Sequence, residues 1–145
     1  MNSNEIRDIM QCLNINEFAG VVPSNKLPIM RLGDKQFYIV NLDTSDSPGS
    51  HWVGLFIKGD EAAYFDPLAL PFTNKLIIQS LKAYKIENII YNTKQIQSFS
   101  SESCAKFVIL FGVCVVKLKF SFTSFLDLFY CQRIRDNEIY INKVL

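Results

Sequence analysis

Apolar and polar positions form their clearest pattern between residues 52 and 65. Two apolar runs, Trp52 to Ile57 and Ala62 to Phe65, flank the polar stretch 58–61, whose Lys-Gly-Asp-Glu composition is typical of a hairpin turn. The pattern therefore predicts two antiparallel strands. Pairing of these strands brings their outer ends side by side, so we expect His51 and Asp66 to be neighbours in space.

Elsewhere the pattern predicts both helices and strands. Apolar residues at helical spacing indicate a first helix over residues 6–13, capped by Asn2 or Ser3, and a second over residues 76–84, capped by Thr73. Aromatic and β-branched residues indicate strands over residues 36–42 and 86–91. Residues 17–28 contain Gly and Pro and are expected to be irregular. Because strands and helices alternate without a strict βαβ rhythm, we predict an α+β fold with a mixed central sheet flanked by helices.

The longest apolar run covers Phe107 to Val116 and is closed by Lys106 and Lys117. A bilayer crossing needs about 20 apolar residues, so this run predicts a buried helix, and we expect no membrane contact. The chain of 145 residues is long enough for one well-packed core. We therefore expect a single domain over residues 1–145.

The four cysteines lie at positions 12, 104, 114 and 131, without C-x-x-C spacing and below the density of a disulfide scaffold. This usage fits a reducing, intracellular compartment. The first residues are polar and acidic where a secretory signal would be basic and then apolar, so we expect a protein that is not secreted. With one histidine and no cysteine cluster, we expect no metal site.

The net charge is only +1, but it is unevenly distributed. Residues 1–74 carry five Lys or Arg against nine Asp or Glu, whereas the segment from Lys75 to Lys119 carries seven lysines against two glutamates. This lysine band predicts either weak DNA binding or simply a solvated surface, and the second is the commoner case.

The candidate chemistry combines the hairpin with the start of the apolar helix. An imidazole beside a carboxylate is an oriented base, which gives His51 and Asp66 a shared role. Cys104 stands in the first turn of the apolar helix, where the helix dipole favours a thiolate. Gln97 lies seven residues upstream and can donate a carboxamide N–H to an oxyanion, together with the Cys104 backbone N–H.

Each of these residues also has a plainer interpretation. Taken alone, Cys104 is more often a small buried hydrophobe than a nucleophile, and loop glutamines such as Gln97 are common. Asp66 precedes Pro67 and could serve only to form a turn, while Trp52 could belong to the core. Motifs for other chemistries are missing, since the chain has no G-x-S-x-G, no Walker phosphate loop and no H-E-x-x-H.

The order of these residues resembles a known family. Gly49-Ser50-His51-Trp52, a strand ending in Tyr-Phe-Asp-Pro, then Gln97, then Cys104 opening an apolar helix is similar to the adenovirus-type maturation proteases of adenoviruses, virophages and polinton-like elements. The resemblance covers most of the chain and implies a papain-like, adenain-like cysteine protease fold. In that family the four matching positions are the catalytic histidine, the acidic residue, the oxyanion glutamine and the nucleophile. The same order occurs in proteases that remove ubiquitin-like modifiers.

The sequence departs from the family at two places. Ala105 follows the nucleophile position where the family usually has glycine. Adenovirus enzymes are activated by a peptide joined through a disulfide to a cysteine ahead of the glutamine, and residues 85–95 contain no cysteine. We therefore expect no required cofactor and leave room only for a non-covalent peptide or DNA activator.

The resemblance implies a cysteine endopeptidase that cleaves viral capsid or core precursors at Gly-Gly-x or Gly-x-Gly-x sites during virion maturation. Trp52 and Ser50 would contact the substrate beside a narrow channel. The protein is then expected in the virion and the infected cell, as a monomer. Two alternatives stay open: a deconjugating protease for ubiquitin-like modifiers, and a non-enzymatic capsid or nucleic-acid-binding module that uses the lysine band.

Overall fold

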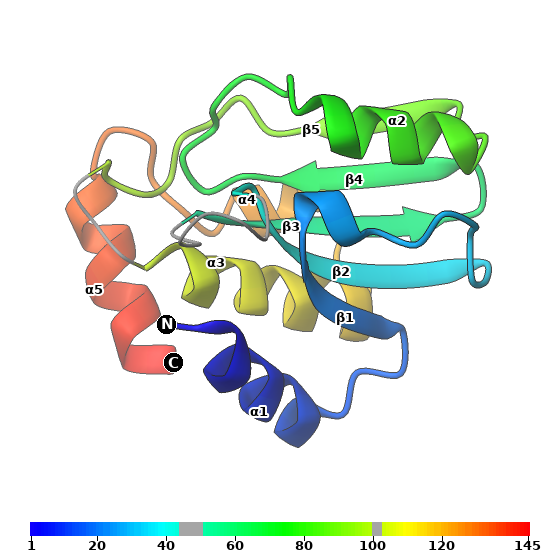
Figure 1. The fold of residues 1–145 in the computed structure, drawn as a ribbon. Coiled ribbons are helices and arrows are strands. Elements are labelled where there is room, and N and C mark those ends of the chain that lie inside the picture. Colours follow the sequence, from blue (N-terminus) through cyan, green and yellow to red (C-terminus); the bar gives the residue numbers. More distant parts are fainter. Residues whose placement is uncertain (44–50, 100–102) are drawn as a thin grey trace.

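The computed structural model describes residues 1–43, 51–99 and 103–145, and these contain one five-stranded mixed sheet (Figure 1). The strands lie side by side in chain order, with parallel pairing at the two ends and antiparallel pairing in the middle. They are β1 (Phe18–Pro23), β2 (Lys35–Asn41), β3 (Trp52–Lys58), β4 (Glu61–Phe65) and β5 (Asn88–Tyr91).

The predicted hairpin is confirmed. β3 and β4 pair antiparallel, with Lys58 opposite Glu61 at the closed end and Gly54 opposite Phe65 near the open end. Gly59 has a φ of 59°, a left-handed conformation that glycine adopts without steric cost in a tight turn. The hairpin register therefore sets where the residues just outside it, His51 and Asp66, can lie.

Two predictions about local structure were wrong. Part of the segment expected to be irregular forms β1, which pairs parallel with β2. Gly20 and Pro23 are tolerated there because β1 is an edge strand, which has one side without ladder partners. The second helix, α2 (Lys75–Ala83), is capped by Asn74 instead of Thr73, and the Asn74 side chain accepts a hydrogen bond from the Ile77 N–H at 3.0 Å.

Helices cover both faces of the sheet. α2 lies on one face together with the short 3-10 helix η1 (Ser24–Lys26), and the other face carries α1 (Ser3–Leu13) and α3 (Cys104–Phe111) (Figure 1). α3 continues into a π-helical segment, η2 (Gly112–Lys117), and then α4 (Phe122–Leu126). The last helix, α5 (Ile134–Val144), lies next to the start of α3 (Figure 1). Each face of the sheet thus has its own apolar core.

Two glycines allow α3 and η2 to pack closely on the sheet. A Cβ at Gly54 of β3 would come within 2.9 Å of the Phe111 ring, and a Cβ at Gly112 would come within 2.5 Å of the Phe37 ring. Such distances require a shift of the aromatic rings or of the helix, so the glycines fix the separation between α3 and β3. This separation also places the first residue of α3 relative to the hairpin.

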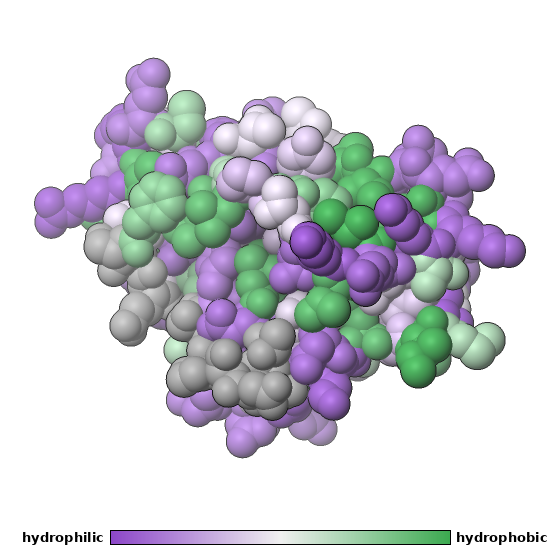
Figure 2. All heavy atoms as spheres, turned by 45° about the horizontal axis from the view of Figure 1, so that its top comes forward, coloured by the Kyte–Doolittle hydropathy of each residue, from purple (hydrophilic) through white to green (hydrophobic). Residues whose placement is uncertain are grey.

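The surface mixes polar and apolar side chains. Figure 2 brings the α2 side forward and shows hydrophobic side chains in separate patches among hydrophilic ones. The most exposed large apolar residues in the described part of the chain are Ile29, Met30 and Leu32, in the connection between β1 and β2. None of the helices formed by the described residues has the length and apolar character needed to span a membrane.

Candidate active site

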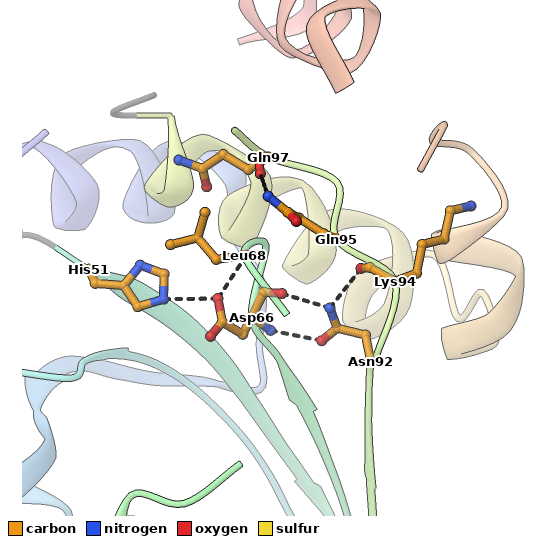
Figure 3. Close-up of polar contacts among 7 residues, drawn as sticks. All are labelled: His51, Asp66, Leu68, Asn92, Lys94, Gln95 and Gln97. Carbon is orange, nitrogen blue, oxygen red and sulfur yellow. Dashed lines mark hydrogen bonds and ion pairs between the residues drawn. The ribbon is translucent and has the colours of Figure 1, made fainter. Parts of the chain in front are cut away.

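His51 and Asp66 meet at the open end of the hairpin, as the strand pattern predicts. His51 immediately precedes β3 and Asp66 immediately follows β4. The Nε2 atom of His51 lies 2.8 Å from Oδ1 of Asp66 (Figure 3). Since Nε2 faces the carboxylate, it carries the ring proton in the neutral imidazole, and Nδ1 is left as the basic nitrogen.

The Asp66 carboxylate is buried and held in position. Its residue is only 1% exposed, and its Oδ1 also accepts a hydrogen bond from the Leu68 N–H at 2.9 Å. No donor among the described residues contacts the other carboxylate oxygen, Oδ2. A buried carboxylate with few donors is poorly solvated, so a positively charged imidazole beside it is strongly favoured.

Asn92 fixes the backbone on which this carboxylate stands. Its Oδ1 accepts the Asp66 N–H at 2.9 Å, and its Nδ2 donates to the Asp66 carbonyl at 2.6 Å and to the Lys94 carbonyl at 3.2 Å (Figure 3). Asn92 is 4% exposed. The amide thus supplies hydrogen-bond partners to a residue that directly follows β4 and is outside the strand pairing.

We expect Asn92→Ala to lower the free energy of unfolding by about 2 kcal/mol, because it leaves the Asp66 N–H without a partner and removes one of the two donors to the Asp66 carbonyl, the other being the Ala69 N–H. Urea denaturation followed by circular dichroism measures the change. Asn88→Ala is the control, because Asn88 begins β5, the strand that Asn92 directly follows, but is exposed. Equal stability of the two variants would contradict the role given to Asn92.

Cys104 is the first residue of α3 and is 4% exposed. Its side chain makes a hydrogen bond with His51. The first turn of a helix presents backbone N–H groups and a partial positive charge, both of which favour a thiolate. The structure therefore brings the thiol, the imidazole and the carboxylate together in one row, from α3 and from both strands of the hairpin.

The electrostatics of this row favour a charged imidazole. Burial lowers the pKa of His51, but hydrogen bonds to Asp66 and Cys104, together with their negative charges, raise it more, so that the pKa rises from 6.5 to about 9. At neutral pH the ring is then mostly protonated. A protonated His51 beside Cys104 is the arrangement expected of a thiolate–imidazolium pair.

A raised pKa makes stability depend on pH. Because the folded-state pKa of His51 (about 9) exceeds its ordinary value of 6.5, protonation favours the folded state. This contribution is complete below pH 6.5 and is lost as the pH rises through about 9. It amounts to at most about 3 kcal/mol, because solvent reaches part of the ring.

Urea denaturation between pH 6 and pH 9.5 tests this expectation. The unfolding free energy of the wild type should fall over that interval, and the fall should be smaller in His51→Gln, which cannot titrate there. Parallel curves for the two proteins would contradict it.

Gln97 is 1% exposed and belongs to a connection that follows β5. Its backbone N–H donates to the Pro67 carbonyl at 3.1 Å, directly after Asp66, and the Ile96 N–H donates to the same carbonyl at 3.0 Å. In Figure 3 the Gln97 carboxamide turns away from Asn92, toward the His51 side of the site. The loop that carries Gln97 is thus tied to the turn that carries Asp66.

The remaining predicted residues are placed as follows. Trp52 is 5% exposed and packs in the core on the α3 side of the sheet, and Ala105 is buried in the first turn of α3. Ser50 lies outside the described residues. Substrate contact by Trp52 and Ser50 therefore stays a prediction. The cysteines at 12, 114 and 131 are free thiols, none of which belongs to the row of His51, Asp66 and Cys104.

No protein-family model matches this chain, and no curated protein matches it. Among solved structures, the ASFV pS273R protease is similar with a TM-score of 0.55 and 15% identity, over 86% of this chain and 60% of that chain. The chain shares the fold of this viral protease. Its selenomethionine form matches with a TM-score of 0.47 and 21% identity, over 72% of this chain and 42% of that one, which is too weak to carry an argument.

The match with a TM-score of 0.55 and the observed strand order confirm the α+β class with a mixed sheet flanked by helices. The chain spans less than two thirds of the length of the proteins it matches. The matched proteins bear the name of an ASFV protease, so the narrower assignment to the adenovirus type stays a prediction.

Sequence reasoning missed Asn92, which was not among the candidate residues. A signal was present. β4, α2 and β5 form a strand–helix–strand unit whose two strands pair parallel, with Tyr64 opposite Tyr91. The carboxyl ends of parallel strands meet at one edge of a sheet, so residues just beyond them, Asp66 and Asn92, become neighbours.

Proposed function

We propose that this chain is a cysteine endopeptidase that processes viral capsid or core precursor proteins at glycine-rich sites, Gly-Gly-x or Gly-x-Gly-x. The observation that carries the proposal is the position of His51, which is hydrogen-bonded both to the buried Asp66 carboxylate and to Cys104 at the start of α3. The fold shared with the ASFV pS273R protease supports it.

In the proposed mechanism, Nδ1 of His51 holds the proton of the Cys104 thiol from the start, as a thiolate–imidazolium pair, while Nε2–H stays hydrogen-bonded to Asp66. The thiolate then attacks the carbonyl carbon of the scissile peptide bond. The carbonyl oxygen becomes an oxyanion, which is stabilised by the Gln97 carboxamide N–H and the Cys104 backbone N–H.

Collapse of this intermediate breaks the C–N bond. His51 in its protonated form gives its proton to the leaving amine, and an acyl group remains on Cys104 as a thioester. Water, deprotonated by His51, hydrolyses the thioester, which releases the carboxylic acid product and returns Cys104 to its starting state. The raised pKa of His51, about 9, keeps the ring protonated when the leaving amine requires a proton.

The glycine preference comes from the resemblance. A narrow channel beside Trp52 and Ser50 would admit only residues without side chains on the amino-terminal side of the cleaved bond. Further parts of the proposal are a monomer that acts in the virion and the infected cell, no required cofactor, and a non-covalent peptide or DNA activator.

Peptide cleavage tests the proposal. Peptides with an internal Gly-Gly-x or Gly-x-Gly-x site are incubated with the protein, with and without duplex DNA, and mass spectrometry maps the new amino termini. Matched peptides with Ala-Ala at the site serve as controls. We expect cleavage after the second glycine and none of the control, and failure to cleave any peptide or capsid precursor would refute the proposal.

Two further measurements separate this proposal from the alternatives. A ubiquitin or SUMO protein ending in an electrophile would label Cys104 in a deconjugase, whereas cleavage of the internal site without labelling favours the maturation protease. A nucleic-acid-binding module would bind DNA in a salt-dependent manner without proteolysis. The lysine band does not form one continuous DNA-binding surface, because Lys75 and Lys82 lie on α2 and Lys106 lies on α3. These two helices cover opposite faces of the sheet.

A further inference from the structure

The loop that carries Gln97 is anchored from two directions. One anchor is the Pro67 carbonyl, which accepts the Ile96 and Gln97 N–H groups. The other is α5, the last helix, from which two consecutive side chains reach the loop. Asn137 donates from Nδ2 to the Ile96 carbonyl at 3.1 Å, and Oε1 of Glu138 accepts the Ser98 N–H at 2.9 Å.

The Asn137 side-chain amide makes hydrogen bonds through both its oxygen and its nitrogen. It is 2% exposed, and besides its bond to Ile96 it bonds to both backbone groups of Tyr130, accepting the N–H at 2.8 Å and donating to the carbonyl. The Gln97 carbonyl in turn accepts a hydrogen bond from the Gln95 side chain at 2.8 Å. The backbone on either side of the Gln97 side chain is therefore held from Gln95 to Ser98.

We infer that α5 sets the position of the Gln97 carboxamide, with Asn137 as the main positioning residue and Glu138 as the second. This inference rests on the proposed function, in which Gln97 donates to the oxyanion. An oxyanion donor contributes only when its N–H is aimed at the place where the charge develops, and an error of about 1 Å can cost up to about 100-fold in rate. His51 precedes β3 and Cys104 begins α3, and neither is bonded to Asn137 or Glu138; α5 bonds α3 at another residue, Asn142, which accepts from Lys106.

The test compares kcat/KM for a glycine-site peptide in single and double variants. Gln97→Ala should lower kcat/KM by about 100-fold, and Asn137→Ala by about 10-fold, mainly through kcat. The double variant should be no slower than Gln97→Ala alone, because Asn137 acts through Gln97. Asn142→Ala is the matched control, since Asn142 lies on α5 but bonds Lys106 of α3, and it should keep wild-type kcat/KM.

Alkylation of Cys104 by iodoacetamide gives a second readout. Its rate and pH profile depend on the His51–Cys104 pair and should be unchanged in Asn137→Ala. A general loosening of the site would instead slow alkylation or shift its profile. If Asn137→Ala does not fold, Glu138→Ala carries the test, because Glu138 is partly exposed and its removal frees only the Ser98 N–H. We expect Glu138→Ala to lower kcat/KM by about 3-fold in the wild-type background and to cause no further decrease in the Gln97→Ala background.

Two outcomes would overturn the inference. One is a folded Asn137→Ala or Glu138→Ala with wild-type kcat/KM, and the other is a double variant in which the losses multiply. Failure of the proposed function looks different: the wild type would then cleave no peptide, and Cys104 would react no faster than the exposed Cys131.

Discussion

Cys104→Ala is expected to lower kcat by at least about 10⁴-fold while leaving the fold intact, because the nucleophile has no substitute within the site. The lost sulfur is small, so the free energy of unfolding should fall by only about 1 kcal/mol. Peptide cleavage and urea denaturation, measured on the same preparation, separate the two effects. Cys104→Ser should be nearly as inactive, since a hydroxyl is far less acidic than a thiol.

The chain offers a matched control. Cys114 is also a buried free cysteine, but it lies in η2, on the following segment of the same helical run. Burial raises the pKa of the Cys114 thiol, which makes it a poor nucleophile. Cys114→Ala should therefore lose a similar amount of stability and keep its activity. Retained cleavage by Cys104→Ala would remove the entire mechanism.

The hairpin could be predicted from the sequence because its two determinants are local. Strand periodicity and turn composition both fall within residues 52–65, and a one-residue slip would turn the apolar side chains of both strands to the wrong face. The contact between His51 and Asp66 follows from that register alone. The start of α3 could also be predicted from the local sequence, because a polar stretch is followed by an apolar run that begins near Cys104.

Contacts between distant segments could not be predicted in the same way. Whether Cys104 meets His51 depends on how closely α3 packs on β3, and this is set by Gly54 and by the Phe111 ring opposite it. A glycine within an apolar strand does not by itself indicate which helix will pack against it. The sequence indicated a base at His51 and a nucleophile at Cys104, and the family resemblance added the expectation that the two residues meet.

The roles of the two buried asparagines, Asn92 and Asn137, could not be predicted from the sequence either. Asn92 and Asn137 lie in segments whose sequences are typical of a loop and of a helix, and nothing local distinguishes a buried amide from an exposed one. Their importance comes from the backbone groups that they satisfy, at Asp66 for Asn92 and at Ile96 for Asn137. Both groups lie in connections outside the strands, so they need partners other than a neighbouring strand.

Replacing Asp66 separates two contributions of its carboxylate, orientation and charge. Asp66→Ala removes the Oδ1 acceptor shared by His51 Nε2 and the Leu68 N–H, so the ring loses both its tautomer preference and its fixed direction. We expect kcat/KM to fall by about 10³-fold or more. Asp66→Asn keeps an oxygen at the Oδ1 position that can still accept from Nε2, so it should cost less than Asp66→Ala, because only the charge is lost.

The pH profile shows which contribution was lost. In the wild type, activity should decline as the pH rises through about 9, where His51 loses its proton. In Asp66→Asn, loss of the hydrogen bond to a charged acceptor and of the attraction to its charge lowers the pKa of His51, so this alkaline limit should move toward lower pH. A limit that stays near pH 9 would mean that Asp66 does not set the charge of the ring.

Stability provides an independent check on the same variant. Asp66 Oδ2 is buried and contacts no donor among the described residues, so an amide NH₂ placed there is a buried donor with no acceptor. We expect Asp66→Asn to lose about 1 to 3 kcal/mol of unfolding free energy at pH 7. Asp60→Asn, at the exposed turn of the same hairpin, should change neither stability nor the pH limit. If Asp66→Asn matched this control in both, the buried carboxylate would serve only to form the turn before Pro67.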